Sequence, residues 1–194
     1  VRHMAYINKM AYAAQTYSNT KDRVISVPWL RLPNHGRNYT GAMGLPREFS
    51  VTYKNGEKVL KQQPVREYED RKKLVYDSAD KNMQQQEDMF QWEFTPDTAT
   101  EIQITRAESE DILHVQVNRD FEFVYNAGTG ELKAGDETFK TEAGIRDFSL
   151  LFDDVIFEVT ADCDTMIGIF ELPRIVEEFC MKKGSAEKIQ IFVS

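Results

Sequence analysis

The chain has 194 residues, which is long enough to bury a hydrophobic core in one or two domains. Hydrophobic residues make up 41% of it and aromatic residues 11%, with 12 Phe and 8 Tyr, a globular composition that favours strands. The formal net charge of −8 argues against a nucleic acid or an anionic membrane as partner, because both need a clustered basic face. No apolar run approaches the ~20 residues of a transmembrane helix.

The start of the chain carries no secretion signal. Residues 1–4 resemble a cloning remnant, so they carry no weight in the fold prediction, and this abrupt start predicts that the chain is a fragment. Cys163 and Cys180 fit neither a disulfide framework nor a zinc site, and we expect two reduced, mostly buried thiols. Together these features favour a cytoplasmic protein.

Strand-like segments fill the first third of the chain. They are alternating, β-branched or aromatic, and they cover residues 11–18, 23–31, 39–51 and 58–65. Asn55-Gly56, between two alternating segments, is a strong hairpin signal. The pattern predicts four antiparallel strands in sequence order.

Pro46 interrupts the third of these segments. A proline removes a backbone donor from a strand ladder and belongs at an edge or a bend. Arg47 and Glu48 follow it directly, so the sequence predicts a bend with a charge pair inside an apolar strand.

The charged run 66–73 is expected to be a solvated helical turn or a linker, and it marks a domain boundary. Beyond it, the strand-like segments are 89–95, 100–107, 111–118, 121–126, a short return strand within 127–135, an antiparallel pair within 148–172, and 188–194. Short strands with frequent turns are typical of a β-sandwich. Segment 173–183 is compatible with a helix or a strand.

Several carboxylates invite a chemical interpretation. Asp153, Asp154 and Glu158 are expected in one strand, where Asp154 and Glu158 would share a face. A metal site or an acid–base pair is possible there, but we favour a solvent-facing edge that resists strand addition. Asp162 and Asp164 are expected in a hairpin turn, because an EF-hand needs more ligands than the segment supplies.

Two residues are candidates for sugar contact. Trp29 and Arg31 lie next to a loop, and an aromatic face can stack on a sugar ring while a guanidinium binds hydroxyls; a tryptophan in a strand is equally compatible with a core position. The histidines, His3, His35 and His114, are scattered, and His114 is expected to be a tolerated polar position. The sequence has no Gly-rich phosphate loop and no Gly-x-Ser-x-Gly elbow.

Three segments in order, YAAQTYSNTKDRVISVPWLR, NYTGAMGLPREFSV and LKQQPVREYEDRK, resemble motifs of glycoside hydrolase family 32, the family of invertases, levanases, inulinases and sucrose-6-phosphate hydrolases. The matching residues are Tyr12, Ala13, Gln15, Thr16, Arg23, Ile25, Trp29, Leu30, Gly41, Met43, Leu45, Pro46, Arg47, Glu48, Gln63, Pro64, Val65 and Glu67. Segments 123–132 and 150–159 resemble the family's C-terminal part more weakly.

The resemblance implies an all-β chain: an antiparallel four-stranded blade, the last of a five-bladed β-propeller, followed by an antiparallel β-sandwich. Residues 1–66 would be the blade, with Pro46 at its bend, and 67–194 the sandwich. The implied activity of the parent enzyme is the retaining hydrolysis of β-fructofuranosyl bonds in sucrose or fructans, with the substrate bound by the rest of the propeller.

The family's catalytic motifs, Asn-Asp-Pro, Arg-Asp-Pro and Glu-Cys, do not occur in the sequence; Arg119-Asp120 precedes Phe121, and Glu178 precedes Phe179. We therefore expect an inactive chain with no catalytic residue, no cofactor and no metal. We also expect self-association through residues 11–51, because a blade freed from its neighbours exposes apolar faces. The alternative is a free-standing carbohydrate-binding β-sandwich, which would carry an exposed aromatic row.

Overall fold

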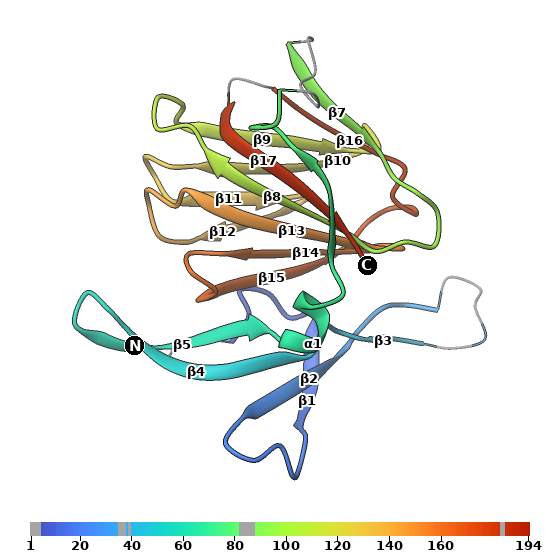
Figure 1. The fold of residues 1–194 in the computed structure, drawn as a ribbon, viewed down its shortest axis with the longest axis vertical. Helices are drawn as coiled ribbons and strands as arrows, with labels where there is room; N and C mark the ends of the chain where they lie inside the picture. Colours follow the sequence, from blue (N-terminus) through green and yellow to red (C-terminus); the bar gives the residue numbers. More distant parts are fainter. Residues whose placement is uncertain (1–4, 35–37, 39, 82–87, 183–184) are drawn as a thin grey trace.

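The computed structural model describes residues 5–34, 38, 40–81, 88–182 and 185–194. Figure 1 shows two parts, a small twisted sheet and a larger two-layered β-sandwich, joined by a short helix. The expected all-β, antiparallel architecture is confirmed.

The first sheet contains five strands, β1 (Ala11–Thr16), β2 (Val24–Leu30), β3 (Ala42–Met43), β4 (Arg47–Lys54) and β5 (Glu57–Pro64). Its order is β1-β2-β4-β5, and β3 pairs with the end of β2. The prediction of four strands is wrong by one, because segment 39–51 divides into β3 and β4. The division falls at Pro46, which directly precedes β4, so the proline removes no ladder hydrogen bond. The bend is therefore confirmed.

Helix α1 (Arg66–Glu69) forms the expected helical turn, and it lies between the first sheet and the sandwich (Figure 1). No helical segment in the described part of the chain is both long and apolar enough to traverse a bilayer.

The sandwich consists of two six-stranded sheets. One has the order β15-β14-β13-β8-β17-β6, with β6 (Lys73–Asp77), β8 (Thr100–Arg106), β13 (Asp147–Asp153), β14 (Ile156–Ala161), β15 (Met166–Glu171) and β17 (Ala186–Val193). The other has the order β12-β11-β10-β9-β16-β7, with β7 (Met89–Glu93), β9 (Ile112–Val117), β10 (Phe121–Asn126), β11 (Glu131–Ala134), β12 (Glu137–Lys140) and β16 (Glu178–Lys182).

Four sandwich segments differ from expectation or decide an open question. Segment 148–172 holds three strands rather than two, because a second turn occurs at Asp154, whose φ of 56° lies in the left-handed region. Segment 173–183 contributes a strand, β16, and no helix. The short strands β6 and β12 were not expected from the sequence, since their charged residues hide the alternation.

The sandwich core is rich in aromatic rings from both sheets. Phe152 and Phe157 stack with ring centroids 4.9 Å apart, and Phe123 meets Phe157 edge-on at 5.7 Å. Rings of this kind bury about 150–250 Å² each and dominate the energetics of a core. The sandwich can therefore stabilise itself.

The first sheet packs against the β14–β15 end of the sandwich (Figure 1). Leu30 and Leu32 form a small buried cluster with Ile167 and Ile169 of β15. Residues 5–10 run along β15, where the Ile7 amide donates to the Ile167 carbonyl at 2.8 Å. One face of the first sheet is thus covered by the sandwich.

Candidate functional site

Trp29 and Arg31 lie on the face of the first sheet that points away from the sandwich. Trp29 is the cross-strand partner of Tyr12 on one side and of Met43 on the other, so these side chains share that face. The Arg31 guanidinium carbon lies 3.9 Å from the centre of the Tyr12 ring, a cation–π contact. Tyr12 is 55% exposed and Met43 is 60% exposed.

Trp29 itself is half-buried, so neither of its two predicted environments describes it fully. Gly41, with φ of +80°, lies directly against the indole, and a Cβ there would come within 2.2 Å of Trp29 Nε1. Only glycine allows this approach. The result is a flat, partly apolar surface with guanidinium donors beside it, which suits either a hydroxylated ligand or a protein segment.

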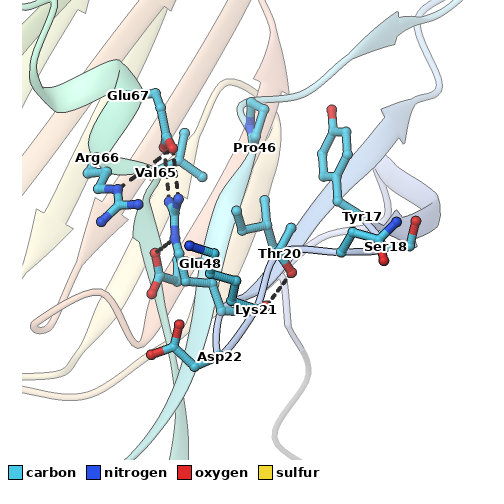
Figure 2. Close-up of a pocket in the computed structure, with 13 residues that line it drawn as sticks. Tyr17, Ser18, Thr20, Lys21, Asp22, Pro46, Glu48, Val65, Arg66 and Glu67 are labelled. Atoms are coloured by element: carbon cyan, nitrogen blue, oxygen red, sulfur yellow. Dashed lines mark hydrogen bonds and ion pairs between the residues drawn. The ribbon is translucent and has the colours of Figure 1, made fainter.

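A second group of charges gathers where three of the family-like motifs meet (Figure 2). Arg23 Nε donates to Glu48 at 2.7 Å, and its two Nη atoms donate to the two oxygens of Glu67 at 2.7 and 2.9 Å. Glu48 therefore pairs with Arg23 and not with its neighbour Arg47, so the predicted charge pair is wrong. The cause is strand alternation, which points adjacent side chains to opposite faces.

The bidentate contact is reflected in the titration of both partners. Hydrogen bonds from Arg23 lower the pKa of Glu67 to about 2, and the same bonds raise the pKa of Arg23. Glu67 is consequently ionised throughout the physiological range. The contact joins the residue that precedes β2 to the start of α1.

Arg47 points to the other face, into the sandwich. Its side chain is 2% exposed and it forms an ion pair with Glu158 of β14, which is 3% exposed. Arg47 also donates to Thr160 Oγ1 and to the Gln62 carbonyl, both at 2.7 Å. Burial, then the Glu158 charge, raises the pKa of the adjacent Tyr6 to about 12.

The prediction of a solvent-facing edge is wrong for Glu158, because the first sheet covers β14. Asp153 and Asp154 do not share a strand with it either; Asp153 ends β13, and Asp154 lies in the turn. Burial and the neighbouring Asp154 charge raise the pKa of Asp153. No local signal could have revealed the burial, because Glu158 and Thr160 alternate with Phe157, Val159 and Ala161, as in a strand with one solvated face.

A second buried ion pair ties the segment after α1 to the sandwich. Lys72 Nζ lies 2.9 Å from Glu101 Oε2, and the two side chains are 6% and 5% exposed. Tyr68 and Ser149 also donate to Glu101. Burial by itself raises the pKa of Glu101, but the hydrogen bonds from Gln103 and Lys72 outweigh it, so the pKa lies below its usual range. The boundary segment is solvated only in part.

The Asp-rich turn contacts the first sheet. Asp162 pairs with Lys54, Asp164 pairs with Lys61, and the Gln62 amide donates to the Asp164 carbonyl at 2.9 Å. Within the described residues, no cluster of three or more His, Cys, Asp or Glu could hold a metal ion. Cys163 at the tip of this turn is exposed, so the expectation of mostly buried thiols is wrong for it.

The remaining candidate residues that the structure describes lie in the sandwich, away from the first sheet. Arg119 pairs with Glu178, Asp120 pairs with Arg174, and His114 lies 3.4 Å from Glu122 on the exposed surface of β9. His114 is thus a surface polar position, as expected. His3 and His35 lie outside the described residues.

The comparisons with known proteins rest on structure. No family model matches the sequence, and no curated protein matches it. An exo-inulinase from Aspergillus awamori superposes on 97% of this chain with a TM-score of 0.69 and 12% identity. A glycoside hydrolase family 32 β-fructofuranosidase from Bombyx mori superposes on 97% of it with a TM-score of 0.70 and 15% identity. A glycoside hydrolase family 32 protein from Bifidobacterium adolescentis superposes on 96% with a TM-score of 0.66 and 18% identity.

This chain spans only part of each of those proteins, 43%, 41% and 32% of their respective lengths. At identities below 20% the likeness concerns the fold. The resemblance indicated by the motifs is confirmed at that level: this chain has the fold of one part of the glycoside hydrolase family 32 enzymes.

Proposed function

We propose that this chain is a non-catalytic supporting module of an enzyme of the β-fructofuranosidase type. In this proposal the first sheet is the final blade of a five-bladed propeller and the sandwich buttresses it. The whole enzyme would hydrolyse the β-fructofuranosyl bond of sucrose or a fructan with retention. The catalytic carboxylates would come from outside this chain, since none of the three catalytic motifs occurs in it.

The observation that carries the proposal is the two-sidedness of the first sheet. One face is fixed to the sandwich by the Arg47–Glu158 pair and the Leu30 cluster. The opposite face exposes Tyr12 and Met43. An apolar surface that is held rigidly from behind is suited to supporting a neighbouring sheet.

The carboxylates near the first sheet support a structural role. A retaining glycosidase needs two carboxyl groups ~5–5.5 Å apart and free to act on the substrate. Here Glu48 and Glu67 are bound by Arg23, and Glu158 is bound by Arg47. Their negative charges serve to hold strands together.

The alternative of a free-standing carbohydrate-binding sandwich predicts an exposed aromatic row on a sandwich face. Within the described part of the sandwich, the strongly exposed large hydrophobic side chains are aliphatic: Leu74, Val75, Met89, Ile112 and Ile175. This observation does not favour the alternative.

The same exposed face accounts for the proposed homo-oligomer. At about 25 cal/mol per Å², an apolar patch of several hundred Å² provides a driving force on the order of 10 kcal/mol. The loss of rotational and translational freedom offsets much of it, so the balance is a weak dimer. Light scattering at tens of micromolar tests this: we expect a dimer that Tyr12→Glu with Met43→Glu dissociates, and a clean monomer would contradict it.

The function is tested by complementation. This chain is mixed with a family 32 catalytic portion that lacks its own last blade and sandwich, and fructose release from sucrose and inulin is measured. We expect no release by this chain alone and a gain of activity on mixing. The gain should be lost with Tyr12→Glu and Met43→Glu.

The matched control is Ile175→Glu, an exposed apolar position of the sandwich that should leave the gain unchanged. Hydrolysis by this chain alone that disappears on mutation of one of its own acids would overturn the non-catalytic role. Equal loss with the control variant would show that the exposed face of the first sheet is not the supporting surface.

A further inference from the structure

A cavity of about 740 Å³ opens at the end of the first sheet away from Trp29. Figure 2 shows Tyr17 and Ser18 on one side of it and Arg66 and Glu67 on the other, with Pro46 between. Small-molecule sites commonly have volumes of about 300–1,000 Å³. The volume of this open pocket falls within that range.

The lining combines an apolar base with an aromatic wall. Ile25 and Val65 are buried and line the cavity together with Pro46. Tyr17 is 54% exposed and stands at one side of the cavity (Figure 2). An exposed ring beside an apolar base presents a flat surface on which the C–H groups of a ring-shaped ligand can stack.

The charges around the cavity cancel. Three cations, Lys21, Arg23 and Arg66, are matched by three carboxylates, Asp22, Glu48 and Glu67. Arg23 uses all three of its nitrogens on Glu48 and Glu67. A carboxylate has about four acceptor positions, so both retain capacity to accept hydrogen bonds from a ligand.

The segment that forms the wall is fixed without a ligand. The Tyr17 amide donates to the Ile25 carbonyl at 3.0 Å, and Thr20 Oγ1 donates to the Arg23 carbonyl at 2.5 Å. Ser18, Asn19 and Thr20 add neutral donors and acceptors to the rim. A site that is formed in advance loses less entropy on binding.

We infer that this cavity binds a small neutral polyhydroxylated ligand, a mono- or disaccharide. Tyr17 stacks on the ring, and Glu48 and Glu67 accept hydrogen bonds from hydroxyl groups. Because the cationic and anionic side chains in the lining balance, neither a phosphorylated nor an ammonium ligand gains a net charge attraction there. The cavity lies on the same outward face of the first sheet as Tyr12 and Met43, at the opposite end of β2. The inference does not depend on the proposed supporting role, because every lining residue belongs to this chain.

Nuclear magnetic resonance titration of the full chain tests the inference, with sucrose, fructose and glucose as neutral probes and fructose 6-phosphate as the charged probe. With at least one neutral sugar, we expect saturable amide shifts confined to residues 17–23 and 65–67. Tyr17→Ala should weaken that binding about tenfold, the loss of one stacked ring. The control Tyr53→Ala removes another exposed tyrosine, one outside the cavity lining, and should leave the affinity unchanged.

Two results would overturn the inference. One is the absence of shifts in residues 17–23 and 65–67 with all three neutral sugars at tens of millimolar. The other is tighter binding of fructose 6-phosphate than of fructose, since that would make the site an anion site. An unchanged melting temperature of Tyr17→Ala ensures that weaker binding is not unfolding. Complementation activity does not enter this test, so its failure and that of the proposed function are distinguishable.

Discussion

The sandwich and the first sheet are both antiparallel β-structures, but they are stabilised differently. The sandwich closes two sheets over rings such as Phe157, which is fully buried and contacts four other phenylalanines. Among the described residues, the first sheet has no second layer of its own. It relies on Arg47, whose partner Glu158 belongs to the sandwich, and Lys72, which follows α1, pairs with Glu101 of the sandwich. The comparison shows that the sandwich has a hydrophobic core of its own, whereas the first sheet is held against the sandwich by buried charged side chains.

The largest effect is expected from Phe157→Ala. It leaves a cavity at the centre of the sandwich and should lower the free energy of unfolding by about 5 kcal/mol. Because the first sheet depends on the sandwich, both parts should lose hydrogen-exchange protection together. Urea unfolding measures the loss, with Tyr53→Ala as the surface control; a first sheet that stays protected would break the comparison.

Arg47→Ala comes next. It leaves Glu158 buried without its cation and should lower the free energy of unfolding by about 3 kcal/mol. We expect amides of β2, β4 and β5 to lose protection while those of β10 and β13 keep it. Uniform loss in both parts would show that the first sheet is not a separately opening unit.

A double variant, Arg47→Met with Glu158→Leu, controls for the Glu158 carboxylate that Arg47→Ala leaves buried without a cation. Replacing both partners by apolar side chains removes the desolvation penalty, and it also removes Arg47 Nε, which has no hydrogen-bond partner among the described residues. The double variant should lie within about 1 kcal/mol of the parent protein. A loss equal to that of Arg47→Ala would mean that the packing, and not the charge, was disrupted.

The second ion pair predicts a pH effect. The pKa of Glu101 is lowered in the folded state, so its stabilisation is complete above its ordinary value of 4.5 and is lost as the pH falls below it. Glu101→Gln should cost about 1–3 kcal/mol at neutral pH, because Lys72 still has Glu69 at 2.7 Å. The difference in stability between Glu101→Gln and the parent protein should vanish in acid. Thermal unfolding at several pH values measures it, and a difference independent of pH would refute the lowered pKa of Glu101.

The smallest effect is expected at the partly exposed pair between Lys54 and Asp162. Such pairs contribute about 0–1 kcal/mol, and Lys54→Ala should therefore stay below 1 kcal/mol and diminish further in high salt. The melting temperature with and without added salt checks this. If Lys54→Ala lowered the stability as much as Arg47→Ala does, buried and exposed ion pairs would not differ in their contribution to stability.

Much of the fold could be predicted from the sequence, because alternation and Asn-Gly or Gly-rich turns act over a few residues. β4, β5, β9 and β10 follow directly from such local patterns. Arg47 and Glu158 are 111 residues apart, and their contact could not be predicted, since it depends on how two sheets pack. The cavity beside Tyr17 has the same origin: it forms between a turn and the start of α1, which approach only after folding.

The position of β17 in its sheet has a consequence for the time course of folding. β17 lies between β8 and β6, and it hydrogen-bonds to both. During synthesis, β6 and β8 leave the ribosome long before β17, which separates them in the folded sheet. The sheet that anchors Arg47 is therefore completed only after Ala186–Val193 has emerged. Such late, long-range pairing is typical of slowly folding proteins, and the incomplete sheet would meanwhile present open strand edges to chaperones.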